Sequence, residues 1–325
     1  MAIQRNKTGE VELSEFAQDV LAGLSRTPKQ LPSKYFYDDV GSALFQQIMQ
    51  LPEYYLTRAE LSIFRDKSAD LANILKPDSS KPLEIIELGA GDGSKTLHLL
   101  NYLEKSGVNL IYRPVDISQK AIDSLKENLK KNGVEITIKP ILADYANFNL
   151  EASNSTRWFF FLGSNLGNYV FYAARNLLAG ITQIMRAGDK LLLGLDKSKS
   201  AELILPAYND STGITAQFNL NLLARINHEM NANFALSKFR HIALFNEEKN
   251  RAESYLQSTE NQMVSLCSVK HEIYFEKQEL IQTEISQKYN QDIVKTLVSN
   301  LPILTLGKVE DDAGYFMDIG FEKLI

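Results

Sequence analysis

The sequence contains few of the residues on which metal sites, disulfide-bonded folds and membrane spans depend. Its 325 residues include a single cysteine, Cys267, and four histidines, so no intrachain disulfide can form and no zinc-ligand spacing exists. No apolar run approaches the ~18 residues of a membrane span, and the opening residues lack the apolar core of a signal peptide. We therefore expect a cytoplasmic protein that holds no metal and has no membrane partner.

The charge balance gives no indication of a polyanionic partner. The chain carries 35 Lys and Arg against 40 Asp and Glu, a net charge of -5 at pH 7, which gives no bulk attraction to nucleic acid. A hydrophobic content of 44% is enough to build a sizeable core. We expect a globular protein that acts on a small molecule, as a monomer rather than an obligate oligomer.

The most informative stretch is EIIELGAGDGSKT, residues 84–96. Its first half is an apolar, β-branched run that ends in an acid, Glu87, and its second half turns through Gly89, Gly91 and Gly93. Glycines let the backbone turn sharply and approach a ligand closely, and the segment that follows has the composition of a helix. This pattern predicts a buried strand that runs into a nucleotide-binding loop.

Strand-like and helix-like segments alternate from residue 83 to residue 196. This alternation of strands and helices predicts a parallel sheet with crossover helices, that is, a doubly wound, Rossmann-like α/β fold. The helices expected in it are residues 118–133 and 172–186. The strands expected in it are residues 84–88, 110–115, 135–142, 157–162 and 190–195.

The alternation of strands and helices stops after residue 196. In residues 239–287 apolar and polar residues alternate instead, in the manner of antiparallel strands. We expect residues 199–288 to form an α+β insertion that combines with residues 1–61 into a second, substrate-binding domain. Residues 62–198 with 289–325 then make up the nucleotide-binding domain.

Two segments stand out in the N-terminal part. Residues 12–24 have the apolar spacing of an amphipathic helix. Residues 31–60 are dense in tyrosine and broken by Pro32, Gly41 and Pro52, which suits either the wall of a pocket or simple packing between domains.

Acidic residues follow the first three expected strands, where ligands bind in a doubly wound sheet. The glycines at 89, 91 and 93, with Ser94 in the sixth position, form GxGxG rather than the GxGxxG that a dinucleotide needs. This favours S-adenosylmethionine as the cofactor over NAD, leaving a dehydrogenase and a turn that binds nothing as the alternatives. The expected cofactor-binding residues are Glu87, Gly89, Gly91, Gly93, Lys95, Asp116, Asp144, Tyr145 and Gly163.

Three of these residues have specific expected roles. Asp116 can accept hydrogen bonds from both ribose hydroxyls. Asp144 can accept from the adenine amine with Tyr145 beside the ring, or can instead cap a helix. Lys95 can neutralise the carboxylate of the methionine moiety, or can be a solvated helix lysine.

Several segments, in order and spacing, resemble the histidine Nα-methyltransferases of ergothioneine biosynthesis. They include LPSKYFYDDVGSALFQQIMQLPEYYLTRAE, ELGAGDGSKT, FLGSNLGN, AYNDSTGITAQFNLNLLARIN and QTEISQKY, and the resemblance spans residues 28–289. It implies a protein that transfers three methyl groups from S-adenosylmethionine to the α-amine of histidine, giving hercynine.

The resemblance also implies roles for individual residues. Tyr54 belongs to the substrate pocket, and Tyr37 lies near the substrate ring or amine. We predict that Tyr37, or a water bound to it, assists the loss of the amine proton. Tyr37 and Asn168 are accordingly the expected catalytic residues. The substrate carboxylate is held by Asn168 and Tyr208, and the imidazole by Glu284 and Ser286, which share a face if they lie on a strand.

One position departs from the family pattern. Where well-known members place a methionine beside the substrate ring, this chain has Ser254. A small polar group there leaves open another amine as the methyl acceptor, such as an indole amino acid. A non-catalytic protein that binds S-adenosylmethionine is the alternative from a different class.

Overall fold

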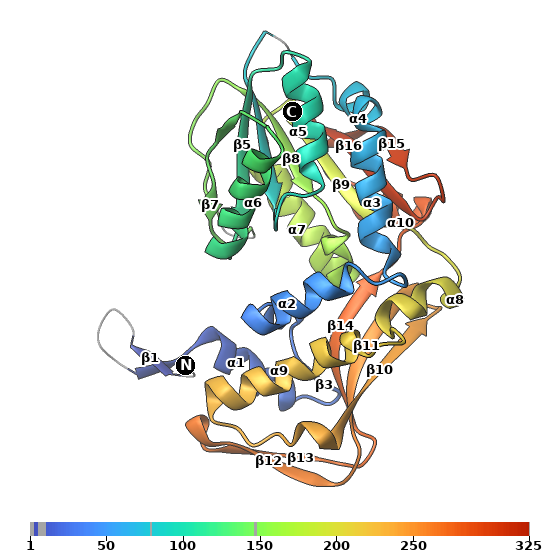
Figure 1. Cartoon of the computed structure of the whole chain (residues 1–325). Helices are drawn as coiled ribbons and strands as arrows, with labels where there is room; N and C mark the ends of the chain where they lie inside the picture. Colours follow the sequence, from blue (N-terminus) through green and yellow to red (C-terminus); the bar gives the residue numbers. More distant parts are fainter. Residues whose placement is uncertain (1–2, 6–10, 79, 146–147, 325) are drawn as a thin grey trace. The chain divides into compact units, whose positions relative to one another are not determined.

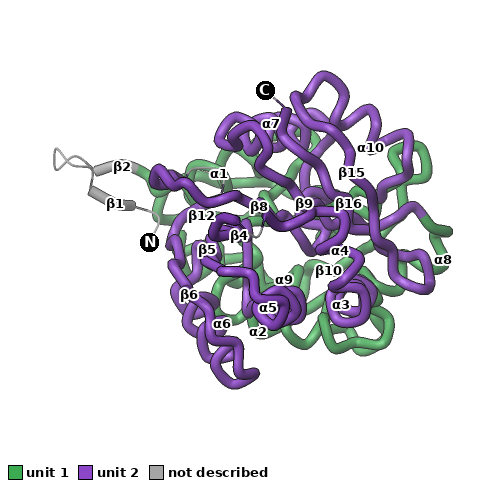
Figure 2. The backbone as a smooth tube through the Cα atoms, turned by 90° about the horizontal axis from the view of Figure 1, so that it is seen from above, with its two compact units in different colours: residues 1–55, 199–287 green, residues 56–198, 288–325 purple. Residues whose placement is uncertain are grey.

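The computed structural model describes residues 3–5, 11–78, 80–145 and 148–324. The chain divides into two compact units, which Figure 2 colours separately. Unit 1 comprises Met1–Tyr55 with Lys199–Gln287, and unit 2 comprises Leu56–Ser198 with Lys288–Ile325. The first boundary that we expected, after residue 61, lies inside helix α3 (Tyr55–Asp66).

Unit 2 is built on one sheet with the strand order β15-β16-β9-β8-β4-β5-β6, and β7 also pairs with β5. Strands β4 to β9 run parallel, whereas β16 is antiparallel to β9 and β15 is antiparallel to β16. The predicted doubly wound α/β fold is thereby confirmed. The strands are β4 (Leu83–Leu88), β5 (Leu110–Asp116), β6 (Thr137–Ile138), β7 (Ile141–Leu142), β8 (Thr156–Phe161), β9 (Lys190–Asp196), β15 (Ile303–Glu310) and β16 (Phe316–Lys323).

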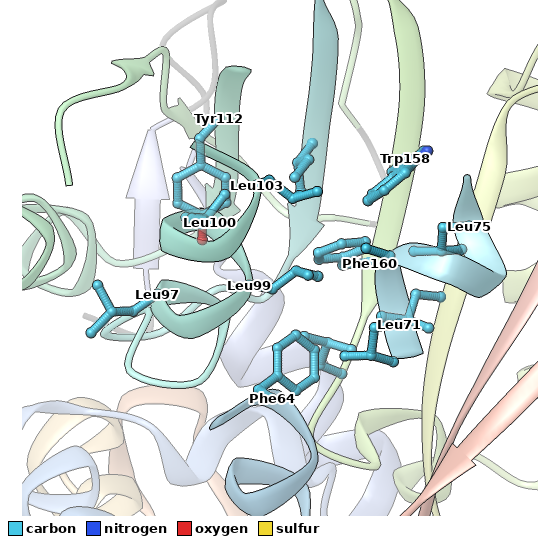
Figure 3. Packing of buried hydrophobic residues seen from close by; sticks show 14 of the residues in the cluster. Phe64, Leu71, Leu75, Leu97, Leu99, Leu100, Leu103, Tyr112, Trp158 and Phe160 are labelled. Carbon is cyan, nitrogen blue, oxygen red and sulfur yellow. The ribbon is translucent and has the colours of Figure 1, made fainter. Parts of the chain in front are cut away.

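Helices cover both faces of this sheet, so its central strands are buried on both sides and read as continuous apolar runs. All six residues of β4 are buried, and neighbours such as Ile85 and Ile86 belong to different hydrophobic clusters. Figure 3 shows the first cluster, where Phe64 and Leu99 lie near Phe160 of the sheet. It contains residues of α3, α4 (Ser68–Leu75), α5 (Thr96–Lys105) and α6 (Gln119–Lys131), which cover one face of the sheet. The second cluster contains residues of α7 (Phe171–Ile184) and α10 (Gln291–Val298), which cover the other face.

One strand of unit 2 differs from the sequence expectation. Residues 135–142 do not form one strand, because β6 and β7 are separated around Pro140, which has no N–H to give to the ladder. The helix expected after Ser118 is confirmed, and the Ser118 side chain accepts a hydrogen bond from Ala121 N–H at 3.2 Å.

Unit 1 contains a four-stranded sheet of order β10-β11-β14-β3 and a separate hairpin of β12 and β13 (Figure 1). The antiparallel strands expected between residues 239 and 287 are confirmed. Helix α9 (Ile214–Met230) packs on β10 and β11, and Phe218 and Leu222 of α9 share a core with Leu256 and Ile281. The strands are β3 (Lys29–Gln30), β10 (Phe239–Asn246), β11 (Arg251–Ser258), β12 (Gln262–Leu266), β13 (His271–Phe275) and β14 (Leu280–Gln287).

The helix expected at 12–24 begins later than predicted. Helix α1 is Glu15–Leu24, and Ser14 caps it by accepting from Ala17 N–H at 3.2 Å. The helix cannot extend further towards the N-terminus because the cap residue has non-helical backbone angles. Val11–Leu13 instead forms strand β2, which pairs with β1 (Ile3–Arg5). The other helical segments of unit 1 are η1 (Ser33–Phe36), α2 (Asp39–Ile48), α8 (Ala201–Ile204), η3 (Leu205–Tyr208), η4 (Leu236–Lys238) and η5 (Cys267–Val269).

Within the described residues, no helix combines the length and the apolar composition needed to cross a membrane. The same residues contain no group of three or more His, Cys, Asp and Glu placed to hold a metal ion.

Candidate functional site

The glycine loop of unit 2 has a backbone that glycine alone adopts readily. Gly89, Gly91 and Gly93 have φ of +71°, +56° and +66°, in the left-handed region. A Cβ added at Gly93 would lie 2.9 Å from Leu125 Cγ, so this glycine is needed for close packing against α6. A Cβ at Gly91 would meet nothing within 4 Å, so there is open space beside the middle of the loop.

Asp116 lies at the end of β5 and is bonded to this loop. Its Oδ2 accepts from Gly91 N–H at 3.0 Å, and its Oδ1 accepts from Ser118 N–H at 2.9 Å. The side chain therefore ties the glycine loop to the start of α6. Each carboxylate oxygen has further lone-pair capacity, so these bonds are compatible with the expected acceptance of ribose hydroxyls.

Glu87, the acid before the loop, is almost fully buried, with 2% of its surface exposed. Tyr112 donates a hydrogen bond to Glu87 Oε2 at 2.5 Å. Burial raises the pKa of Glu87 to about 7, against the opposing effect of the Tyr112 hydrogen bond. This carboxyl group thus changes charge near neutral pH.

Lys95 is not a solvated helix lysine. It forms an ion pair with Glu60 of α3, whose side chain is 1% exposed. Glu60 also accepts from Gly163 N–H, at 2.8 Å to Oε1 and 3.0 Å to Oε2. Glu60 therefore connects the helix after the glycine loop with the turn after β8.

Glu60 was not singled out in the sequence analysis, although its position carried a signal. In α3 it is buried together with Leu56, Ala59, Ile63 and Phe64, the spacing of one helical face. An acid within an apolar stripe must be paired or hydrogen-bonded, and such a residue is a candidate for function.

The loops after β4, β7 and β8 come together. A Cβ at Gly89 would lie 3.4 Å from Asn165 Nδ2 and 3.7 Å from the Tyr145 ring. Tyr145 packs on Phe161, with 5.4 Å between ring centroids, and its hydroxyl is 2.8 Å from that of Tyr169. The expected cofactor residues at these strand ends are thus neighbours.

Asp144 and Asn168 occupy the same end of the sheet. Asp144 is exposed, and no helix follows it among the described residues, so the alternative that it caps a helix is not supported. Asn168 is half-buried and ends η2 (Asn165–Asn168), the turn that follows β8.

Four of the five residues expected to bind the substrate lie in unit 1, namely Tyr54, Tyr208, Glu284 and Ser286, whereas Asn168 belongs to unit 2. Glu284 and Ser286 both lie on β14, two positions apart, and therefore face the same side of the strand. The Tyr208 hydroxyl donates to Ser286 Oγ at 2.7 Å, and both residues are buried. Glu284 is half-buried.

Ser254 lies directly opposite Glu284 on the neighbouring strand β11. It is 1% exposed, and its Oγ has no hydrogen-bond partner within the part of the chain that the structure describes. The position that departs from the family pattern is therefore a buried, unsatisfied hydroxyl beside Glu284.

Tyr37 and Tyr54 belong to one aromatic cluster. Tyr37 packs edge-on against Phe45 and Phe218, with 5.4 and 5.8 Å between ring centroids, and Phe45 lies 6.0 Å from Tyr54. Burial of the hydroxyl, followed by the charge of Glu284, raises the pKa of Tyr37 above the ordinary phenol value. The whole residue is 40% exposed, so this shift reflects the surroundings of the hydroxyl rather than those of the ring.

The residues of unit 2 fit S-adenosylmethionine. The open space at Gly91 admits a ligand beside the loop, and Asp116 offers carboxylate oxygens for ribose hydroxyls. Lys95 would supply a cation for the cofactor carboxylate, and Tyr145 and Asp144 would supply a ring and an acceptor for adenine. The GxGxG loop has Ser94 in the sixth position, where a dinucleotide-binding loop has its third glycine.

Comparison with known proteins extends this assignment. The profile of a family described as "Histidine-specific methyltransferase, SAM-dependent" matches residues 16–323. The histidine N-alpha-methyltransferase of Mycobacterium tuberculosis is 36% identical over 300 residues, 92% of each chain. Ergothioneine biosynthesis protein 1 of Schizosaccharomyces pombe is 32% identical over 70% of this chain and 31% of its own.

A more distant relative acts on an indole compound according to its name. The 4-dimethylallyltryptophan N-methyltransferase easF of Claviceps fusiformis is 26% identical over 73% of this chain and 66% of its own. The family match covers nearly all of the chain and contradicts the dehydrogenase alternative. The protein is therefore a member of the family of S-adenosylmethionine-dependent, histidine-specific methyltransferases.

Proposed function

We propose that this protein transfers methyl groups from S-adenosylmethionine to the α-amine of histidine and produces hercynine, the trimethylated product. The observation that carries the proposal is the polar row of unit 1, in which Glu284 and Ser286 share one face of β14 and Tyr208 donates to Ser286. The 36% identity to a histidine N-alpha-methyltransferase supports the same substrate.

The polar row suits an imidazole. A neutral imidazole has one donor and one acceptor, and an imidazolium has two donors. The Glu284 carboxylate can accept from either form, while the Ser286 hydroxyl can accept or donate. An indole has a single N–H donor and no acceptor, so it would leave one member of this pair unused.

The substrate carboxylate is proposed to bind Asn168 and Tyr208. The single proton of the Tyr208 hydroxyl is directed to Ser286 at 2.7 Å. To donate to a carboxylate, Tyr208 must exchange that bond, and Ser286 is then released to serve the imidazole. The two subsites are in this way coupled through one hydrogen bond.

Catalysis requires alignment and loss of the amine proton. When bound, S-adenosylmethionine supplies an electrophilic methyl group on a sulfonium. The Tyr37 phenol, whose pKa is raised further above its ordinary value, stays protonated at neutral pH, so Tyr37 acts as a hydrogen-bond partner rather than as a phenolate base, and a water bound to it takes the amine proton. Fixing the amine in line with its target at ~3 Å is worth a large effective molarity.

We further propose that the protein works in the cytoplasm as a monomer and that its product enters ergothioneine biosynthesis. The single cysteine fits a reducing compartment. The name of the Schizosaccharomyces pombe relative supports the pathway. Light scattering of the purified protein tests the monomer.

The substrate proposal is tested by incubating the protein with methyl-labelled cofactor and a panel of free amino acids, followed by mass spectrometry. We expect label on histidine, with the mass of three added methyl groups at completion. Tryptophan and α-N-blocked histidine serve as controls. Faster labelling of tryptophan, or labelling of the blocked histidine, would overturn the proposal.

A further inference from the structure

A second carboxyl group lies beside the Glu60–Lys95 ion pair in unit 2. Asp318 of β16 is fully buried, and neither of its carboxyl oxygens has a hydrogen-bond partner among the described residues. A Cβ added at Gly194 of β9 would lie 2.3 Å from Glu60 Oε1 and 3.1 Å from Asp318 Oδ1. The two carboxyl groups therefore flank the same point, and only glycine fits opposite Asp318.

One ammonium cannot compensate two buried carboxylates, so the pair cannot carry two negative charges. Burial, and next the charge of Glu60, raise the pKa of Asp318 well above its ordinary value, against the opposing effect of Lys95. Glu60 accepts from two donors, the Lys95 ammonium and the Gly163 N–H, whereas Asp318 has no donor among the described residues. Asp318 is thus the protonated member of the pair.

We propose that Glu60, backed by a neutral Asp318, is a positioning residue for S-adenosylmethionine. Its carboxylate holds the Lys95 ammonium and the Gly163 amide together, and a Cβ at Gly163 would lie 3.3 Å from Lys95 Nζ. The cation expected to receive the cofactor carboxylate and the turn after β8 are therefore fixed before the cofactor binds. This inference is independent of which amine accepts the methyl group.

The first test is a double-mutant cycle on binding of S-adenosylhomocysteine, measured by calorimetry without any methyl acceptor. Glu60→Gln should weaken binding ~10-fold or more, because the half-buried Lys95 loses the charged partner that positions its ammonium. In a Lys95→Met background the same change should have little further effect, since Glu60 acts through Lys95. Additive effects would overturn the proposal.

Glu310→Gln is the matched control. Glu310 accepts from Lys197 at 2.9 Å in the same unit, but both side chains are about one-quarter exposed. Its removal should leave the affinity for S-adenosylhomocysteine unchanged. An equal loss in this variant would show that any lost ion pair of unit 2 has the same effect, and would contradict a specific role for Glu60.

The second test follows the charge of Asp318 in the cofactor-free protein. A carboxyl group whose pKa is raised on folding contributes to the stability of the folded protein. This contribution is complete below the pKa of the unfolded chain and is lost as pH rises from that value through the pKa of the folded protein. Asp318→Asn should therefore gain melting temperature relative to wild type as pH rises from about 4.

The charged groups that act on Asp318 are Glu60 from α3 and Lys95 before α5, and the same two groups also act on Glu87 of β4. Its direct neighbours on β9 and β15, Gly194 and Val309, carry no charge. A melting-temperature difference between Asp318→Asn and wild type that does not change with pH, or that falls as pH rises, would show that Asp318 is ionised and would refute the arrangement. This arm holds even where Glu60→Gln fails to fold.

Discussion

Glu284 is a half-buried carboxylate on β14, next to Ser286 and opposite Ser254. Hydrogen bonds to a charged group contribute about 1.5–3 kcal/mol, which corresponds to roughly 10–150-fold in affinity. Glu284→Ala should therefore raise the KM for histidine by one to two orders of magnitude and leave binding of S-adenosylhomocysteine intact. Steady-state kinetics and calorimetry measure the two effects.

The control for this variant is Glu272→Ala, which removes an exposed acid from the β12–β13 hairpin of the same unit. It should change neither constant. Unchanged kinetics in Glu284→Ala would exclude Glu284 from the site.

Ser254 combines two unfavourable properties, since its hydroxyl is buried and has no partner in the described structure. Leaving such a group unsatisfied costs about 1–3 kcal/mol. Ser254→Met should lower the KM for histidine, because a thioether removes the unsatisfied hydroxyl and offers apolar contact to the substrate ring. Ser254→Ala separates these two contributions, and a KM that stays the same or rises in Ser254→Met would contradict the prediction.

Glu87 gives a prediction on pH. Burial raises its pKa from 4.5 to about 7, so the folded protein binds a proton that the unfolded chain releases in this range. Its contribution to stability is complete below pH 4.5 and is lost as pH rises through about 7. Glu87→Gln should therefore gain melting temperature relative to wild type over this interval, as measured by calorimetry. A constant difference would show that Glu87 has no raised pKa.

At the scale of elements, the junction of β4 and α5 depends on Gly93. This residue has φ of +66°, and an added Cβ would meet Leu125 Cγ at 2.9 Å. Gly133 has a similar φ of +71° but nothing within 4 Å, so Gly133→Ala carries the backbone strain without the clash. Gly93→Ala should cost more than the ~1 kcal/mol expected of Gly133→Ala, and should also weaken S-adenosylhomocysteine binding. Equal losses of stability in both variants would contradict this reading.

Elements with a local cause could be predicted from the sequence. The buried strand β4 and its glycine loop follow from a β-branched run and three glycines, and α6 follows from the cap at Ser118. Two differences from the expected elements also have local causes. Pro140 interrupts the expected strand, and the cap residue Ser14, which directly follows β2, makes α1 begin at Glu15. In both cases a capping or ladder requirement overrode apolar spacing.

The ion pair of Glu60 and Lys95 could not be predicted in this way, and neither could the burial of Asp318. These side chains come from α3, the start of α5 and β16, which only the sheet order of unit 2 brings together. Likewise, Ser254 faces Glu284 because of the β11–β14 register, which shifts at a bulge between Ser254 and Tyr255. Single-sequence patterns carry no information on such pairings.

At the scale of the whole molecule, each ligand is expected to slow hydrogen exchange in its own set of segments. S-adenosylhomocysteine should slow exchange in residues 87–96 and 163–168 of unit 2, where the loops after β4 and β8 lie. Histidine, added to the complex, should slow exchange in residues 205–212 and 280–287 of unit 1. Mass spectrometry of peptides gives the map, and protection by histidine confined to unit 2 would contradict a substrate site in unit 1.

The strand order of unit 2 also sets a sequence of events during synthesis on the ribosome. Strand β9 lies between β8 and β16, but β16 emerges about 120 positions later, which takes on the order of ten seconds at ~5–20 residues per second. Throughout this time, which includes the translation of residues 199–287 of unit 1, the nascent sheet has an unpaired apolar edge at β9. The growing chain is thus most exposed to edge-to-edge aggregation after its glycine loop is complete and before the β15–β16 hairpin arrives.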